Sequence, residues 1–91
     1  MEIDSTAIVT GGGRGIGQAI CTELARCGAD IVIADIDADQ MEETKRLVEE
    51  EGQRALGVET DVSDQADVEE LVDTTVEEFG SVEILVNNAG I

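Results

Sequence analysis

Glycines gather near the start of this 91-residue chain, in the stretch Thr10-Gly-Gly-Gly-Arg-Gly-Ile-Gly17. The apolar run Ala7-Ile8-Val9 precedes the stretch, and a helix-like run over 18–27 follows it. The first amide hydrogens of a helix lack intrahelical partners and carry partial positive charge, so such a turn favours an anion, above all a phosphate. Glycine permits the tight turn and lets the backbone approach the phosphate oxygens, which a Cβ would prevent. The stretch therefore predicts a phosphate-binding loop.

The spacing of the glycines narrows this prediction. It is Gly11-x-x-x-Gly15-x-Gly17, and the strict G-x-G-x-x-G pattern is absent. A P-loop is excluded, because no Lys-Ser or Lys-Thr pair follows the glycines. The plainer alternative is a tight turn that binds nothing. Arg14, the one cation of the loop, either steadies a phosphate or extends into solvent.

Asp35 ends the next apolar run, eighteen residues after Gly17. A carboxylate at such a distance, at the carboxyl end of a strand, can accept hydrogen bonds from both ribose hydroxyls of an adenosine. It would repel a 2′-phosphate, as would the nearby Asp37 and Asp39, whereas Arg14 acts weakly in the opposite sense. We therefore expect NAD to be preferred over NADP. The alternative is a solvated acid at a strand end.

Asp61 and Val62 follow a third strand-like run. In a dinucleotide site this turn would reach the adenine, through the carboxylate of Asp61 and through the backbone and apolar side chain of Val62. Alternatively, Asp61 only helps to start the next helix. The sequence has no histidine and no C-x-x-C pair, so no metal site is expected. Cys21 and Cys27 lie too far apart along one helix for a disulfide, and we expect both to be reduced.

The chain is strongly acidic, with 22 Asp and Glu against 5 Lys and Arg and a net charge of −17. This charge repels nucleic acid and anionic membranes, so neither is an expected partner. It suggests adaptation to high salt, where the Debye length falls to about 3 Å at 1 M, although a heavily solvated acidic surface is the alternative. No run is long and apolar enough to span a membrane, and no basic-then-apolar leader opens the sequence, so a cytoplasmic location is expected.

Apolar patterning predicts one domain over 1–91 in which strands and helices alternate. The expected strands are 6–10, 30–35, 54–59 and 82–86. The expected helices are 18–27, 38–51 with Asp37 as its cap and Gln40 bonding back, and a third from Ser63 or Asp64 to Gly80. This alternation predicts a doubly wound α/β (Rossmann) three-layer sandwich with strand order 3-2-1-4, and a ligand in the crevice between the first and fourth strands.

Two helices carry apolar stripes that we expect to face the sheet. The stripe of the first helix is Ile16, Ile20, Leu24 and Cys27. The stripe of the third helix is Val68, Leu71, Val72, Val76 and Phe79.

The motifs together resemble the N-terminal half of a short-chain dehydrogenase/reductase, similar to 3-oxoacyl-acyl-carrier-protein reductases and sugar or alcohol dehydrogenases. They are Thr10-Gly-x-x-x-Gly-Ile-Gly17, Asp35 after Ile-Val-Ile-Ala, Asp61-Val62, and Asn87-Asn88-Ala89-Gly90. The resemblance implies that Gly11, Arg14, Gly15, Ile16 and Gly17 contact the pyrophosphate and adenosine side of NAD. It assigns the adenine ribose to Asp35, the adenine to Asp61 and Val62, and the pocket wall to Asn88, Ala89 and Gly90. Asn87 would brace the fourth strand.

The family's catalytic residues have no counterpart here. They are a Ser, a Tyr-x-x-x-Lys pair and a supporting Asn on the helix after the fourth strand, and this sequence contains no tyrosine. The complete family enzyme transfers a hydride between nicotinamide and an alcohol or carbonyl, with the tyrosine as acid and base. We therefore assign no catalytic residue and expect the chain, as a fragment, to be inactive alone. The alternatives are a non-catalytic nucleotide-binding or interaction module completed by a partner chain, and a remnant that only folds.

The strand over 82–86 is expected to be an exposed apolar edge, because no fifth strand follows it. Unpaired backbone groups on such an edge pair readily with another chain. We expect self-association or partner pairing through this edge, or marginal stability.

Overall fold

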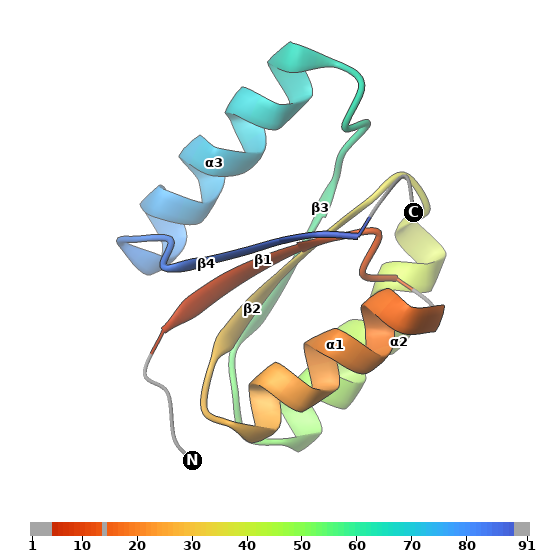
Figure 1. The fold of residues 1–91 in the computed structure, drawn as a ribbon, viewed down its shortest axis with the longest axis vertical. Coiled ribbons are helices and arrows are strands. Elements are labelled where there is room, and N and C mark those ends of the chain that lie inside the picture. Colours follow the sequence, from red (N-terminus) through yellow and green to blue (C-terminus); the bar gives the residue numbers. More distant parts are fainter. Residues whose placement is uncertain (1–4, 14, 89–91) are drawn as a thin grey trace.

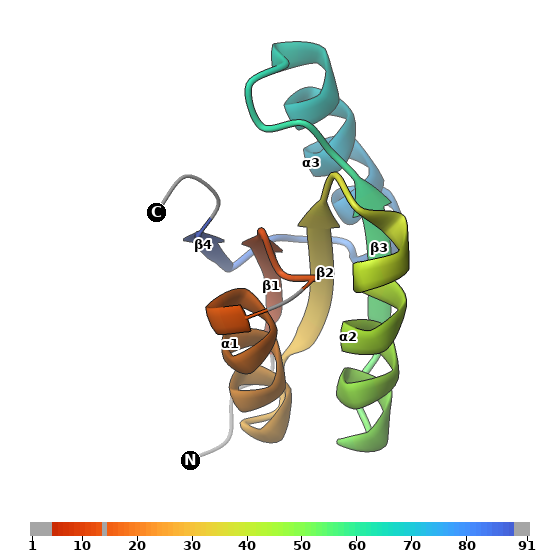
Figure 2. The same ribbon diagram turned by 90° about the vertical axis from the view of Figure 1, so that its right-hand side faces the viewer.

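The computed structural model describes residues 5–13 and 15–88. In these residues the elements alternate as β1 (Thr6–Thr10), α1 (Gly15–Arg26), β2 (Asp30–Asp35), α2 (Ala38–Glu50), β3 (Ala55–Glu59), α3 (Gln65–Phe79) and β4 (Ile84–Asn87). All strand pairs are parallel, and the sheet order is β3-β2-β1-β4. Helices α1 and α2 cover one face of the sheet and α3 covers the other (Figures 1 and 2). The predicted fold class and strand order are confirmed.

Side chains that alternate across the sheet build a core on each face. On the side of α1 and α2, the sheet residues of the core are Ala7, Val9, Ile31 and Ile33. On the side of α3, they are Ile8, Val32 and Ala34, which pack with Leu71. Every residue of β1 is buried. Strands buried on both faces need continuous apolar runs, which explains why β1 and β2 could be recognised in the sequence.

The face that α1 turns toward the sheet differs from the predicted stripe. The buried residues of α1 are small ones at helical spacing, Gly17, Cys21 and Ala25. Ile16, which was predicted to be buried, is 70% exposed, and Ile20 and Leu24 pack only partly against the core. The reason is a close approach: a Cβ on Gly17 would overlap the carbonyl oxygen of Gly11. Small side chains bring the first turn of α1 against the end of β1, which bulky ones would prevent.

The residues that cap α2 and α3 are among those predicted from the sequence, but one predicted hydrogen bond at the start of α2 is corrected. Oδ1 of Asp37 accepts hydrogen bonds from the amides of Asp39 and Gln40, at 3.0 and 3.2 Å. The predicted bond from Gln40 back to the amide of Asp37 is replaced, because that amide donates to Oδ1 of Asp35 at 3.1 Å. Asp64, one of the two predicted candidates, caps α3. Both helices therefore begin where short acidic side chains accept the first free amides.

The far side of α3 and β4 is apolar and open in the described residues. Val72 and Val76, from the predicted stripe of α3, are exposed, whereas Leu71 is buried. Leu85 of β4 is 66% exposed, and β4 is the outer strand beside β1. The predicted exposed edge is therefore present. No helix in residues 5–13 and 15–88 combines the length and apolar character that crossing a membrane requires.

Replacing Gly17 by alanine is expected to destabilise the fold. The added Cβ overlaps Gly11 and lies 2.8 Å from Nδ2 of Asn88, and overpacking of this kind costs about 1–3 kcal/mol. The matched control is Gly57→Ala, whose Cβ lies 3.5 Å from Met41 at ordinary contact distance and is expected to be neutral or slightly stabilising. Urea unfolding monitored by circular dichroism compares the two. Equal unfolding midpoints for both variants would show that the close approach of α1 does not govern stability.

Candidate functional site

The carboxyl ends of β1, β2 and β4 meet at one edge of the sheet. Thr10 stands level with Ala34 on one side and with Asn87 on the other. The glycine loop, Asp35 and Asn88 follow these three residues directly, so they gather at the point where the strand order reverses (Figure 1). Open parallel sheets bind ligands at such a switch point. Of the predicted contact residues, Arg14, Ala89 and Gly90 lie outside the described residues.

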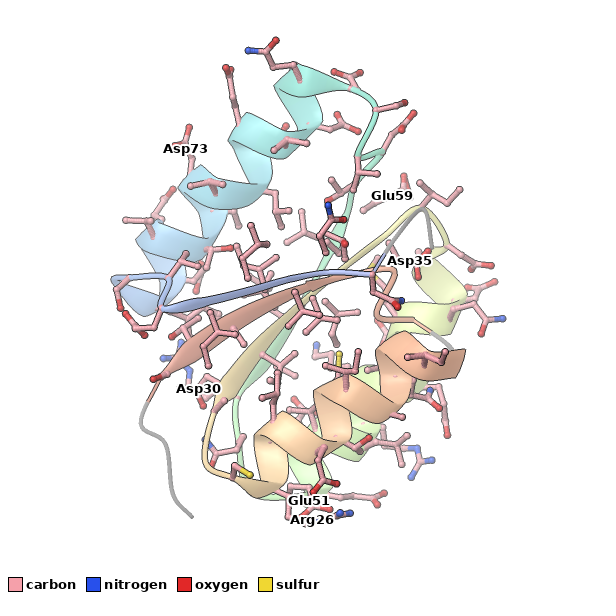
Figure 3. The ribbon with its side chains drawn as sticks, in the orientation of Figure 1. Arg26, Asp30, Asp35, Glu51, Glu59 and Asp73 are labelled. Atoms are coloured by element: carbon pink, nitrogen blue, oxygen red, sulfur yellow. The ribbon has the colours of Figure 1, made fainter. Side chains whose placement is uncertain are left out.

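Asp35 points at the glycine loop. Its Oδ2 accepts a hydrogen bond from the amide of Gly13 at 3.0 Å. A Cβ on Gly13 would lie 2.7 Å from that oxygen and 2.9 Å from Cβ of Gln40, so a side chain there would displace the carboxylate. Figure 3 shows Asp35 at the end of β2, where it is partly exposed. Each carboxylate oxygen can accept more than one hydrogen bond, which leaves acceptor capacity for a ligand.

Gly13 was missed by the sequence analysis as a site residue. The signal that could have found it is the third consecutive glycine, because the turn pattern itself requires no glycine at that position.

The start of the loop is fixed from both neighbouring strands. The amide of Gly11 donates to the carbonyl of Ala34 at 2.7 Å, and its carbonyl accepts from Nδ2 of Asn88 at 3.2 Å. Oγ1 of Thr10 accepts from the amide of Asn88 at 3.0 Å and donates to Oδ1 of Asn87 at 3.1 Å. Asn88 therefore ties the loop to the end of β4, and its place in the wall of a cofactor pocket stays a prediction.

The first turn of α1 begins at the same edge of the sheet, directly after the glycine loop. Gly15 adopts φ +59, the left-handed region that favours glycine, and both Gly15 and Ile16 are exposed. Gly17 is buried beneath the carbonyl of Gly11, so its role in the described structure is close packing. The first turn carries no acidic residue. An anion placed there meets partial positive charge without a competing carboxylate from the helix itself.

A cleft of about 380 Å³ opens beside Asp35, lined by residues 35–39. Three of the five lining residues are aspartates, Asp35, Asp37 and Asp39. Ile36, in the same cleft, is 70% exposed. The sequence analysis missed Ile36, although a large apolar residue between two aspartates directly after a strand is an unusual placement. The cleft combines hydrogen-bond acceptors with one apolar surface.

Asp61 organises the turn that precedes α3. Its carboxylate accepts from Oγ of Ser63 at 2.6 Å and from the amide of Ser63 at 2.9 Å, and these hydrogen bonds hold the pKa of Asp61 below its usual value. The amide of Thr60 donates to the carbonyl of Asp35 at 2.8 Å, which places this turn next to the acidic cleft. The alternative predicted for Asp61, a role in starting α3, matches these contacts. Its contact with adenine stays a prediction.

Val62 is exposed and lines a second, apolar cleft of about 290 Å³ between α3 and β4. Contact between Val62 and adenine also stays a prediction.

The two cysteines are free thiols in the structure. Burial raises the pKa of Cys21 to about 12, so this thiol is protonated at neutral pH and is a poor nucleophile. Within the described ranges, no group of three or more His, Cys, Asp or Glu side chains is arranged to hold a metal ion.

Comparisons with known proteins agree with this geometry. Residues 5–91 match the family model of the short chain dehydrogenases. Diacetyl reductase [(S)-acetoin forming] of Staphylococcus epidermidis is 40% identical over 89 residues, which are 98% of this chain and 35% of that protein. Hydroxysteroid dehydrogenase from Escherichia coli superposes with a TM-score of 0.93 at 35% identity, over 99% of this chain and 39% of that one.

A structure of carveol dehydrogenase from Mycobacterium avium in complex with NAD gives a TM-score of 0.90 at 31% identity, over 96% of this chain and 36% of that one. The chain spans about a third of the length of the curated relatives that it matches.

Proposed function

The chain belongs to the short-chain dehydrogenase family, and from that premise we propose that it is the NAD(H)-binding portion of an oxidoreductase. The complete enzyme is proposed to transfer a hydride between nicotinamide and an alcohol or carbonyl compound. The observation that carries the proposal is the bond between Asp35 and the amide of Gly13. It holds a ribose-binding carboxylate beside the first turn of α1, so groups suited to a sugar and to a phosphate face one crevice.

In this proposal, different residues of the described structure bind different parts of the cofactor. The exposed first turn of α1 at Gly15 and Ile16 would hold the diphosphate, because its free amides and the helix dipole favour negative charge. Asp35 accepts hydrogen bonds from the adenine ribose. The side chains of Ile36 and Val62, both exposed, offer apolar surface to the adenine ring. The nicotinamide of the bound cofactor supplies or accepts the hydride.

The three aspartates of the acidic cleft support a preference for NAD over NADP. A 2′-phosphate on the ribose would enter the region of Asp35, Asp37 and Asp39. Juxtaposed like charges cost several kcal/mol when they are poorly solvated.

Hydride transfer also needs a group that moves a proton on the substrate, and the sequence contains no tyrosine and no histidine for that task. We therefore propose cofactor binding without turnover for these 91 residues.

The acidic surface supports a proposal of adaptation to high salt. Helix α3, whose sequence is QADVEELVDTTVEEF, carries six acidic residues and no basic one. Glu69, Asp73 and Glu77 follow one another at i, i+4 spacing, where like charges destabilise a helix. The ion pairs of Arg26 and Arg46 with neighbouring glutamates are exposed and therefore contribute little. Screening by salt relieves this repulsion.

The apolar side formed by α3 and β4 supports the proposal of an interface. Val72, Leu85 and the 290 Å³ cleft lie next to the free edge of β4. A free strand edge with apolar neighbours pairs readily with another strand. We propose that a second copy of this chain or a partner chain covers this side.

Titration with NAD and NADP tests the proposed cofactor. We expect NAD to bind more tightly, and Asp35→Asn to weaken NAD about tenfold and to reduce the preference, because hydrogen bonds to a charged group contribute about 1.5–3 kcal/mol. Isothermal titration calorimetry at fixed salt measures both affinities. The control is Asp73→Asn, which removes the same charge from an exposed position on α3 and should change neither. Equal binding of NADP by the unaltered chain would refute the preference.

Thermal unfolding in KCl tests the adaptation to salt. We expect the melting temperature to rise by several degrees between low and molar KCl, because the Debye length shortens from about 30 Å at 0.01 M to about 3 Å at 1 M. The double variant Glu69→Gln and Asp73→Asn, which removes two of the like charges on α3, should show a shallower rise. A melting temperature that is flat or falls with KCl contradicts the proposal.

Size measurement tests the interface. We expect the chain to elute in gel filtration at molar KCl as a species larger than a monomer, and Leu85→Lys to shift it toward the monomer, because the lysine places a charge on the exposed edge strand. Ala19→Lys, which adds the same charge at an exposed position of α1 on the other face of the sheet, is the control. If the unaltered chain elutes as a monomer and unfolds in one cooperative transition, the result argues against self-association.

A further inference from the structure

A buried hydroxyl lies behind the glycine loop, on a residue to which the proposed site assigns no contact with the cofactor. Thr44 of α2 has 0% of its surface exposed. Its Oγ1 donates to the carbonyl of Gly12 at 2.9 Å and accepts from Nε2 of Gln18 at 3.0 Å. A threonine hydroxyl has a single hydrogen, so the donation from Gln18 leaves that hydrogen for Gly12. A side chain of α1 and a side chain of α2 thus join at one point of the loop.

Thr44 and Asp35 form hydrogen bonds with the two ends of one peptide group. Thr44 donates to its carbonyl oxygen, and Asp35 accepts from its N–H. The carbonyl of Gly12 and the N–H of Gly13 are the two ends of one planar unit. The N–H donates to Oδ2 of Asp35 at 3.0 Å. The hydrogen bonds therefore run in one direction, from Gln18 through Thr44 and the peptide to Asp35, and each polarises the next. The orientation of this peptide fixes which group the carboxylate meets.

The peptide between Gly12 and Gly13 needs such a restraint. Neither residue has a Cβ, so the sterics that hold other peptides in place are weak on both sides. A rotated peptide would turn its carbonyl oxygen toward Asp35, and a carboxylate can only accept hydrogen bonds. Oδ2 of Asp35 would then lose its donor and be repelled from the loop, whereas Oδ1 would keep the amide of Asp37. The hydroxyl of Thr44 favours the orientation that Asp35 requires, and it is the stronger of the two donors to the Gly12 carbonyl, because the other is the thiol of Cys21 at 3.9 Å.

We propose that Thr44 is a positioning residue for Asp35 and that it sets recognition of the adenine ribose through the Gly12–Gly13 peptide. The inference rests on the proposed function, in which Asp35 accepts the ribose hydroxyls. Thr44 is buried behind the loop and acts through it. Gln18 orients the hydroxyl of Thr44 and completes the relay.

Three variants of the 91-residue chain test the relay. Thr44→Val keeps the branched shape and removes the hydroxyl, whereas Thr44→Ser keeps the hydroxyl. The control is Thr75→Val, because Thr75 is also 0% exposed and donates to a backbone carbonyl, that of Leu71 at 2.7 Å, on the opposite side of the sheet. Any general loss of stability from removing a buried hydroxyl appears in this control.

Two readouts separate the relay from a merely structural role. Hydrogen exchange of the Gly13 amide, followed by NMR without nucleotide, reports whether the peptide stays oriented. The ratio of the dissociation constants of 2′-deoxy-ADP and ADP reports how strongly the ribose hydroxyl is recognised. We expect Thr44→Val to speed Gly13 exchange by about tenfold, the factor that corresponds to one lost hydrogen bond of about 1.4 kcal/mol, and to bring the ratio toward one. Thr44→Ser and Thr75→Val are expected to keep both values.

The inference would be overturned if Thr44→Val kept the wild-type rate of Gly13 exchange and the wild-type ratio of the 2′-deoxy-ADP and ADP dissociation constants. It would also be overturned if Thr75→Val changed both quantities as much as Thr44→Val does. If the unaltered chain binds no ADP, the proposed function fails, and Gly13 exchange alone then decides the relay. If Thr44→Val does not fold, Gln18→Met tests the same relay by removing the donor that orients the hydroxyl. Unchanged Gly13 exchange in a folded Gln18→Met would then overturn the inference.

Discussion

The carbonyl oxygen of Gly11 occupies the space that a side chain on Gly17 would fill, and the candidate site depends on this contact. It brings the first turn of α1 against the end of β1, so the helix starts at the edge where the other strands end. The same carbonyl accepts from Asn88, which ties β4 to the loop. One backbone oxygen therefore links a helix, a loop and two strands. A larger residue in place of Gly17 would move the helix start away from Asp35.

Rigid strands determine which residues can act together at this edge. The register sets Thr10, Ala34 and Asn87 at one level, and the residue after each of them enters the site. Because β1 and β2 are buried on both faces, a shift of register by one residue would exchange the side chains of the two cores and disrupt the packing of both. The register of the strands therefore fixes where the loops that follow them begin. Thus residues far apart in sequence, such as Gly13 and Asp35, meet at hydrogen-bond distance without a dedicated linker.

The sequence predicted the features that depend on local pattern. Continuous apolar runs located β1 and β2, residue type and spacing identified the cap Asp37, and they limited the cap of α3 to Ser63 or Asp64, of which the structure has Asp64. The face of α1 was predicted only in part: Ile20 and Leu24 pack against the core, but Ile16 is exposed and the fully buried residues are small ones that close packing requires. The roles of Gly13 and Thr44 depend on contacts between elements, and no spacing within one element reveals them.

The distribution of acidic residues resolves a conflict between the charge of the chain and its ligand. A net charge of −17 repels a diphosphate, and this repulsion acts over the Debye length. Helices α2 and α3 place Asp39 and Asp67 in their first turns, where acids stabilise a helix, whereas the first turn of α1 has none. That omission leaves the positive end of α1 to an external anion. Salt screens the distant repulsion but hardly weakens direct hydrogen bonds, so the site keeps its short-range attraction under the conditions in which the acidic surface is best tolerated.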